Sequence, residues 1–361
     1  MAVGLPLKTT YADGDVYSAS DVNDTNGTIN ANVNPFTAGK NRIINGDFGV
    51  WQRGTSFTNP AAFSYLVDRW RWGTDGTGST TVFSRQTFTP GAAPVTGYEG
   101  VYFLRWDRSV ATSGATYDDF YQPIENVQTG ANQTVTVSFW VKAAAAKTLT
   151  LVLSQNFGSG GSAQVSTTAG TASVTTSWQR FTLTVALPSI SGKTIGTGSS
   201  LGFVFRAPFN TTFTFDIWGV QLEQGSTATA FQTATGTIQG ELAACQRYYY
   251  RTGGNAGASA YGILGYGQAY ATTGAYCHIP LPTTMRVKPT TIDISALSTF
   301  WLTDGVATFV PTNIVSDTNV TNQNTAVLVI VGSGFSQYRF YQTTANNTGS
   351  GYAYIGMSAE L

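Results

Sequence analysis

The sequence predicts an all-β protein: a jelly-roll β-sandwich, then a second β-sandwich-like domain, preceded by a short N-terminal helical or extended anchor. Three observations lead to this fold class. Apolar and polar side chains alternate in one short run after another. Turns rich in Gly, Ser and Thr separate these runs. No amphipathic helix of about ten residues intervenes, which excludes the crossover helices of a parallel sheet.

Residues 1–40 form the predicted anchor, because they are poor in aromatic residues and rich in Asn, Asp and Thr. Within them, four residues recur at steps of four and three, which is the spacing of a heptad seam. These seam residues are Val22, Asn26, Ile29 and Val33. A helix this short is marginal alone, so we expect it to be ordered in a homotrimer or against a docking partner. A frayed terminus is the alternative interpretation.

Residues 41–235 form the predicted jelly roll. The clearest strand pattern is 133–142, where Val135, Val137 and Phe139 alternate with polar residues and with Trp140. The same alternation recurs in 149–153, 181–187, 201–205 and 213–217. Five half-buried strands in succession favour a sandwich, and we expect jelly-roll topology.

Residues 236–361 form the predicted second β domain. A linker at 233–237 leads to one helical turn at 241–245 and an aromatic strand at 248–250. Cys245 and Cys277 lack metal or disulfide spacing, so both are predicted as buried free thiols. Further strand patterns occupy 276–281, 290–294, 299–302, 306–310, 326–331, 338–342 and 352–357.

Composition restricts the class of partner. Only 11% of the 361 residues are charged, so Thr, Ser, Asn and Gln must supply most of the polar surface, which suits packing or sugar contact. Nineteen basic and nineteen acidic residues leave no net field to attract nucleic acid. No apolar stretch is long enough for membrane insertion, and no secretory signal opens the chain, so we expect it to be made and folded in a cytoplasm.

Ordered motifs in residues 41–231 resemble the carbohydrate-binding-module-like jelly rolls of bacteriophage tail and head fibre proteins. These motifs are NRIINGDF (41–48), WQRGT (51–55), VDRW (67–70), QPIE (122–125), VTVSFWVK (135–142), SWQRF (177–181), DIWGVQLEQG (216–225) and ATAF (228–231). The segments ELAACQRYY (241–249), PTTMRVKP (282–289) and SAEL (358–361) resemble the C-terminal module that follows this jelly roll in phage fibres. The segments YADGD (11–15) and SASDVN (18–23) resemble fibre amino termini.

This resemblance implies a structural protein of the virion, a fibre-type subunit that is frequently trimeric and contacts other virion proteins through its N-terminal segment. Its expected role is adsorption to the host cell through a surface glycan or protein. A structural adaptor or capsid decoration protein without receptor contact is the alternative. The resemblance leaves tail and head attachment equally open.

No catalytic residue is predicted, and we expect the protein not to be an enzyme. His278 is the only histidine and lies in a strand pattern, without the Asp-x-x-His sequence of a serine esterase. Asp118 and Asp119 would point to opposite faces of a strand, so they cannot flank one glycosidic bond, and we assign them to a solvated loop. A carboxylate pair from distant segments, such as Glu99 and Glu125, stays open.

The family resemblance also suggests a structural calcium ion held by Asp47 and Asp216, because related sugar-binding jelly rolls carry carboxylates near their first and last strands. In the competing interpretation, no cofactor is bound and Asp216 accepts hydrogen bonds from Trp70 or a backbone amide. For glycan binding the candidates are Trp140 and Trp218, which point away from the core of their sheet. The alternative is that a loop or a neighbouring subunit covers both rings.

Overall fold

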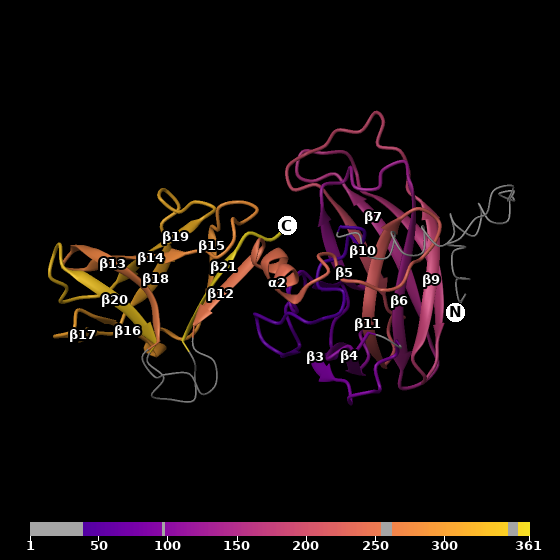
Figure 1. The fold of residues 1–361 in the computed structure, drawn as a ribbon, viewed down its shortest axis with the longest axis horizontal. Coiled ribbons are helices and arrows are strands. Elements are labelled where there is room, and N and C mark those ends of the chain that lie inside the picture. Colours follow the sequence, from indigo (N-terminus) through magenta and orange to yellow (C-terminus); the bar gives the residue numbers. More distant parts are fainter. Residues whose placement is uncertain (1–38, 96–97, 254–261, 346–352) are drawn as a thin grey trace, which may run out of the picture.

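The computed structural model describes residues 39–95, 98–253, 262–345 and 353–361. Two β-sandwiches lie side by side and are connected through the helix α2 (Ile238–Gln246) (Figure 1). Most of the predicted anchor, including the seam residues Val22, Asn26, Ile29 and Val33, lies outside the described residues.

The first sandwich consists of two antiparallel sheets. The six-stranded sheet has the order β1-β3-β4-β11-β6-β9, and the five-stranded sheet has the order β2-β5-β10-β7-β8. The first sheet contains β1 (Ser56–Thr58), β3 (Thr80–Thr87), β4 (Tyr102–Val110), β6 (Thr134–Ala143), β9 (Gln179–Ala186) and β11 (Phe213–Gln224). The second contains β2 (Arg71–Thr74), β5 (Asp118–Glu125), β7 (Lys147–Asn156), β8 (Val165–Val174) and β10 (Ser200–Arg206).

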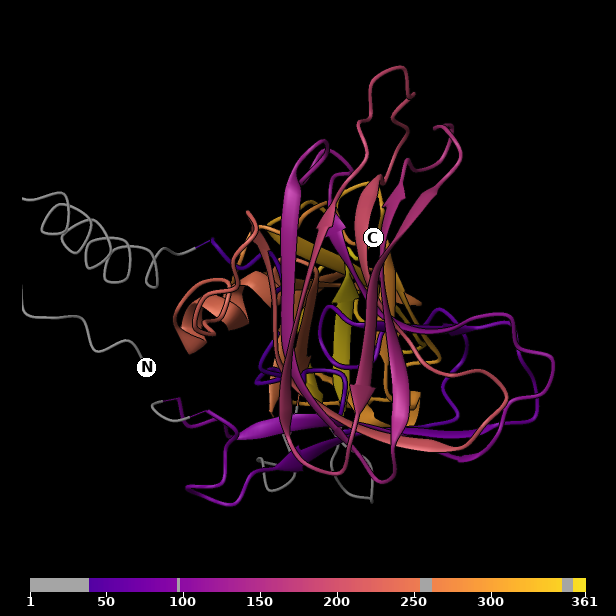
Figure 2. The same ribbon diagram turned by 90° about the vertical axis from the view of Figure 1, so that its right-hand side faces the viewer.

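Aromatic and aliphatic side chains from both sheets fill the space between them. Phe139 of β6 and Phe205 of β10 are fully buried there, with ring centroids 5.0 Å apart. Complete burial of one such side chain stabilises the fold by roughly 2 to 3 kcal/mol. The five strands predicted from alternation are confirmed as β6, β7, β9, β10 and β11. The predicted turns rich in Gly and Ser lie in the loops between these strands. Figure 2 shows loops that extend beyond one end of the strands.

The second sandwich packs a three-stranded sheet, β12-β21-β15, against a seven-stranded sheet, β17-β16-β20-β13-β14-β19-β18. The small sheet contains β12 (Tyr249–Gly253), β15 (Thr291–Ile294) and β21 (Tyr354–Ser358). The large one contains β13 (Ile263–Ala271), β14 (Gly274–Pro280), β16 (Phe300–Thr303), β17 (Thr308–Phe309), β18 (Asn313–Ser316), β19 (Thr325–Val331) and β20 (Phe340–Ala345). The predicted fold class is therefore confirmed for both domains.

The helix between the domains is longer than the single turn predicted. It begins after Thr237, whose hydroxyl accepts a hydrogen bond of 3.0 Å from the amide of Gly240 and so caps the first turn. Cys245 within it and Cys277 on β14 are buried free thiols, as predicted. Among the described residues, no helix reaches the length and apolarity that crossing a membrane requires.

Candidate functional site

The outer face of the six-stranded sheet carries the two tryptophans predicted to bind glycan. Trp140 and Trp218 do point away from the core, but Trp140 is 7% exposed and Trp218 is fully buried. They pack together in a small second cluster with Phe88, Phe103 and Phe231. The prediction of an exposed sugar platform at Trp140 and Trp218 is therefore wrong, because loop residues cover both rings.

Asp216 lies on this same covered face and forms ion pairs with basic side chains. Its carboxylate accepts bidentate hydrogen bonds of 2.7 and 2.8 Å from Arg105, and Lys142 Nζ lies 3.5 Å away. Trp70, one of the two alternative donors predicted for Asp216, donates to the carbonyl of Asn45 instead, so that alternative is wrong. Two cations around Asp216 leave it a poor calcium ligand.

Asp47, the other predicted calcium ligand, lies in the turn before β1. Its carboxylate accepts a hydrogen bond from the amide of Gly49 at 3.2 Å, and the Tyr98 hydroxyl lies 3.5 Å away. Burial, and secondarily the charge of Glu241, raise the pKa of Asp47 to about 6. Within the part of the chain that the structure describes, no three His, Cys, Asp or Glu side chains gather as a metal site. Asp47 and Asp216 are thus not brought together in such a group.

The other acidic candidates have structural partners. Asp118 and Asp119 belong to β5 rather than to a loop, and their side chains point to opposite faces as predicted. Asp118 is buried and paired with Arg108, whereas Asp119 pairs with Arg206. Glu99 accepts from the amide of Gly91 at 2.7 Å, and Glu125 accepts from the hydroxyl of Tyr248 at 2.9 Å. His278 is exposed on β14, within the strand pattern predicted for it.

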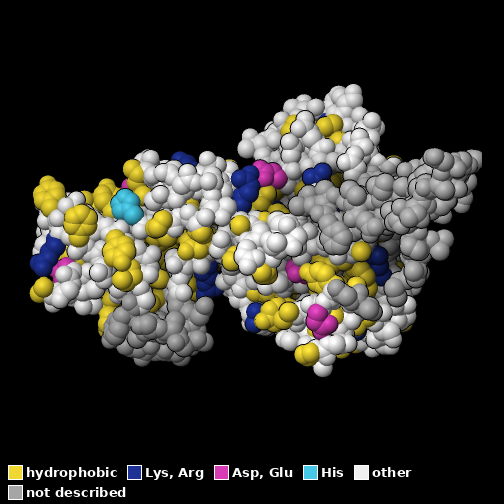
Figure 3. Space-filling model, viewed as in Figure 1, with side chains coloured by type: hydrophobic (Ala, Val, Ile, Leu, Met, Phe, Trp, Pro, Cys, Tyr) yellow, Lys and Arg dark blue, Asp and Glu magenta, His cyan; other side chains and the backbone are white. Residues whose placement is uncertain are grey.

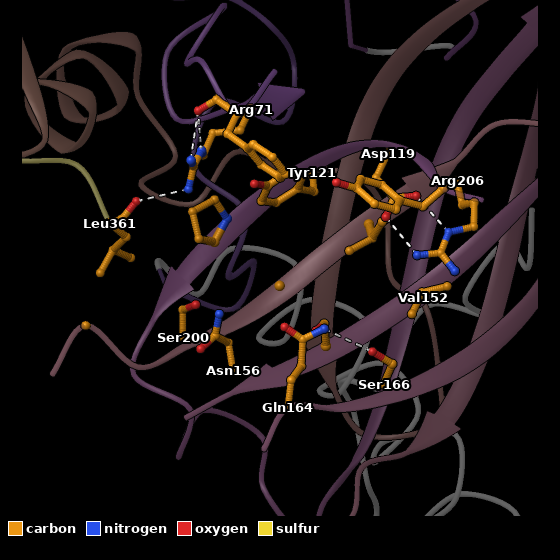
Figure 4. Close-up of a pocket in the computed structure, with 17 residues that line it drawn as sticks. Arg71, Asp119, Tyr121, Val152, Asn156, Gln164, Ser166, Ser200, Arg206 and Leu361 are labelled. Carbon is orange, nitrogen blue, oxygen red and sulfur yellow. Dashed lines mark hydrogen bonds and ion pairs between the residues drawn. The ribbon is translucent and has the colours of Figure 1, made fainter. Parts of the chain in front are cut away.

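The outer face of the five-stranded sheet, in contrast, is open. A groove of about 460 Å³ lies on it, and its lining comes from all five strands, from the adjoining loops and from Leu361 (Figure 4). Its size is within the range of small-molecule and cofactor sites in proteins. This groove is the candidate functional site.

The floor of the groove is made by strand positions that alternate with core positions. On β10, Leu201, Phe203 and Phe205 face the core, while the residues between them face the groove. Gly202 stands at the centre of the floor, opposite Pro123 of β5 and Ser154 of β7. Because glycine has no side chain, the middle of the floor is hollow.

Gly202 has ordinary backbone geometry and an open space above it. A Cβ added there would lie 3.4 Å from the Cβ of Ser154 and 3.8 Å from a methyl group of Val204, which are ordinary contact distances. Backbone conformation therefore does not require glycine at this position. The absence of a side chain at Gly202 makes the groove deeper at this point.

Aromatic side chains form one wall. Tyr121 of β5 stands next to Arg71 of β2, whose guanidinium carbon is 5.6 Å from the centroid of the tyrosine ring. Phe63 and Tyr117 add two more rings, with centroids 6.4 Å apart. Arg71 is held in place because its Nε and Nη2 atoms donate to the carbonyl of Phe63 at 3.0 and 2.8 Å.

Polar groups occupy the rest of the lining. Arg206 donates two hydrogen bonds, of 2.7 and 2.8 Å, to the carboxylate of Asp119. Ser154 is 8% exposed, and its hydroxyl oxygen has no hydrogen-bond partner among the described residues. Asn156, Gln164, Ser166 and Ser200 supply further amides and hydroxyls (Figure 4). The groove therefore combines ring faces with a dense set of uncharged hydrogen-bonding groups.

Two loops close one end of the groove and brace each other. The loop after β7 and the loop before β10 pair at Ser159 and Thr197, which form an isolated antiparallel bridge. The amide of Gly196 also donates to the carbonyl of Phe157 at 2.7 Å. Since Gln164 and Gly198 of these loops line the groove, the loops determine its length at this end.

The sequence reasoning missed this groove, although a signal for it was present. Part of its lining consists of residues interleaved between the core residues of a predicted strand, as in Ser200, Gly202, Val204 and Arg206. Period-two alternation identifies two faces of a strand equally well. It does not say which outer face is covered, because the covering residues are distant in the sequence.

No protein-family model and no curated protein matches this sequence. Solved structures with similar folds include the enzymatically active domain of tailspike protein 4 of bacteriophage CBA120, at 15% identity and a TM-score of 0.33, over 52% of this chain and 22% of that one. A family 11 carbohydrate-binding module of the cellulase Lic26A-Cel5E of Clostridium thermocellum is similar at 14% identity and a TM-score of 0.30, over 48% of this chain and 98% of the module. The CBM22-1 xylan-binding domain of Paenibacillus barcinonensis Xyn10C has 11% identity and a TM-score of 0.31, over 53% of this chain and 99% of that domain. This chain thus covers less than a quarter of the tailspike chain and nearly the whole of each carbohydrate-binding module.

Proposed function

We propose that this protein is a fibre-type subunit of a bacteriophage virion that binds a glycan of the host cell surface without cleaving it. The groove on the five-stranded sheet is the observation that carries the glycan part. The ordered sequence motifs support the virion part, in which the N-terminal segment attaches the subunit to other virion proteins. Attachment to the tail and to the head both fit this proposal.

A sugar ring suits this groove chemically. Pyranose rings have an apolar face that packs on an aromatic ring, and Tyr121, Tyr117 and Phe63 offer such rings. The polar edge of a sugar needs hydrogen-bond donors and acceptors at many angles. The amides and hydroxyls of Asn156, Gln164, Ser166 and Ser200 supply them.

The carboxylates of the groove support the proposal of binding without cleavage. A glycosidase needs two carboxyl groups about 5 to 10 Å apart across one bond. Among the described residues that line the groove, Asp119 has the single carboxylic side chain, and Arg206 engages both of its oxygens. We therefore expect incubation with a bound polysaccharide to release no new reducing ends.

The glycan part is tested by filling the groove. We expect the full-length protein to bind at least one glycan on an array of bacterial surface polysaccharides and β-glucans. The Gly202→Leu variant should lose at least about tenfold in affinity, which corresponds to about 1.4 kcal/mol, because the new side chain occupies the floor. The Cβ of the new side chain meets only ordinary contacts, so the backbone of the floor should keep its place.

The matched control is Thr182→Leu, which places the same side chain at an exposed position of β9 in the other sheet. This control should bind like the wild type. If wild-type protein binds no arrayed glycan, or if Gly202→Leu binds unchanged, the glycan-binding groove is refuted. Fluorescent protein that decorates particles but leaves host cells unlabelled would instead favour an adaptor or decoration protein.

A further inference from the structure

The groove is not built by the jelly roll alone, because Leu361 of the C-terminal module lies in its wall. The carbonyl of Leu361 accepts hydrogen bonds from the Tyr65 hydroxyl at 2.7 Å and from Arg71 Nη1 at 3.3 Å. Figure 4 shows Leu361 and Arg71 joined at one end of the groove. Since Arg71 stands beside Tyr121, the second domain contacts the wall where the aromatic rings are.

The residue before it, Glu360, anchors this end of the module in the jelly roll. Its carboxylate is 5% exposed and pairs with two arginines of the first domain. One oxygen lies 3.1 Å from Arg53 Nη2, and the other contacts Arg69 Nη1. Removing one partner of a buried ion pair leaves an uncompensated buried charge. Loss of the Glu360 carboxylate should therefore weaken the docking of the two domains.

Arg69 connects this ion pair to the groove. Its side chain is 1% exposed, its guanidinium stacks on Tyr248 at 3.5 Å from the ring centroid, and Nη2 donates to the carbonyl of Pro123. Pro123 lines the groove floor. Arg69 also has a φ of 73°, a backbone conformation that is rare for an arginine and persists when surrounding contacts enforce it. Arg69 therefore links Glu360, the C-terminal module and the groove strand β5.

A second set of contacts supports the same junction. The Arg53 guanidinium lies 3.6 Å from the centroid of the Tyr249 ring, and Gln52 Nε2 donates to the carbonyl of Tyr249 at 2.7 Å. Arg251 Nη1 donates back to the carbonyls of Gln52 and Arg53 at 3.1 and 2.9 Å. The two domains are thus held together over several residues, and not by Glu360 alone.

We infer that the C-terminal module completes the glycan groove, and that Glu360 and Leu361 position its aromatic wall through Arg69 and Arg71. This inference rests on the proposed glycan-binding function of the groove. It makes affinity depend on how the two domains dock. By linkage, a bound glycan chain stabilises the domain junction by the same factor as the junction strengthens binding.

The test compares full-length variants on the polysaccharide that the wild type binds on the array. We expect Glu360→Gln to lower affinity about tenfold, equivalent to about 1.4 kcal/mol. Leu361→Ala keeps the ion pairs and changes only the wall, so it should lower affinity by a smaller factor. The control is Asp304→Asn, which removes a carboxylate paired with Arg339. Asp304 lies between β16 and β17, at the end of the C-terminal module that is distant from the jelly roll (Figure 1).

Hydrogen–deuterium exchange without any polysaccharide gives a second readout. In Glu360→Gln, exchange should become faster not only in residues 354–361 but also in 71–74, the strand that carries the wall. Faster exchange confined to 354–361, or wild-type affinity in both junction variants, would overturn the inference. Failure of the wild type to bind any polysaccharide would instead overturn the proposed function on which it rests.

Discussion

Two adjacent aspartates show how strand geometry separates structural from surface roles at the level of single residues. Asp118 faces the protein interior, where it pairs with Arg108 and accepts a hydrogen bond from Trp72 Nε1 at 3.1 Å. Asp119 faces the groove and pairs with a partly exposed Arg206. The same residue type, one position apart, therefore lies in two different dielectric environments.

Asp118→Asn should lower the free energy of unfolding by roughly 3 kcal/mol, because it leaves the buried charge of Arg108 without its partner. Asp119→Asn is the matched control and should change stability by less than about 1 kcal/mol, since its ion pair is partly solvated. Urea unfolding of the two variants measures both values. Equal losses of stability would contradict the assignment of the two faces.

Asp47 makes the stability of the protein depend on pH. Its pKa rises from the usual 3.8 to about 6 in the folded state. The folded protein therefore binds more protons than the unfolded chain, and the stabilisation is complete below pH 4 and lost as the pH rises past 6. At about 1.4 kcal/mol per pKa unit, the contribution is roughly 2 to 3 kcal/mol.

The variant Asp47→Asn cannot ionise at this position. It should be more stable than wild type at pH 7 by up to roughly 2 kcal/mol, and its unfolding free energy should fall less between pH 4 and pH 7. A residual dependence should remain, because burial also raises the pKa of Asp68 to about 6. Urea unfolding at a series of pH values measures this. Parallel curves for variant and wild type would rule out Asp47 as the source.

At the scale of the elements, alternation predicted the strands with large apolar side chains. Strand β10 is an example, since Leu201, Phe203 and Phe205 all face the core. Strand β8 was missed because its sequence, VSTTAGTASV, carries few large apolar residues and depends on pairing with β7 for its place in the sheet. Local pattern thus predicts a strand where large apolar side chains alternate with polar ones, and fails where pairing alone maintains the strand.

The choice of the functional face could not be made from strand patterns. Trp140 and Trp218 on one sheet, and Tyr121 on the other, all alternate outward from core residues. Phe88 and Phe231, distant in sequence, cover the tryptophans, while the groove side stays open. Which ring is covered is a property of tertiary packing, so the sequence supported the wrong pair.

At the scale of the whole molecule, the motifs that carried the family resemblance meet in one place. Arg53 and Arg69 come from the WQRGT and VDRW motifs, and Glu360 comes from SAEL. Tyr248 and Tyr249 of the ELAACQRYY motif stack on the two arginines. The motifs were visible in the sequence, but that they form a domain junction followed only from the structure.

The molecular surface fits a protein whose contacts do not depend on net charge. Figure 3 shows charged side chains scattered among uncharged polar and apolar ones on the displayed face. With nineteen basic and nineteen acidic residues, long-range electrostatic steering is weak. For the proposed glycan groove, several copies acting together would raise the overall binding strength, as multivalency provides.

The predicted homotrimer is the arrangement that would supply these copies. Multi-angle light scattering of the full-length protein at micromolar concentration should give three times the 38.3 kDa of one chain. Ile29→Asp should shift the protein toward monomer, because the predicted seam of Val22, Asn26, Ile29 and Val33 cannot bury a charge without a partner. The control Thr28→Asp changes a neighbouring position outside the seam and should leave the mass unchanged. A monomeric wild type would reject self-assembly through this segment and leave trimer formation dependent on docking to the particle.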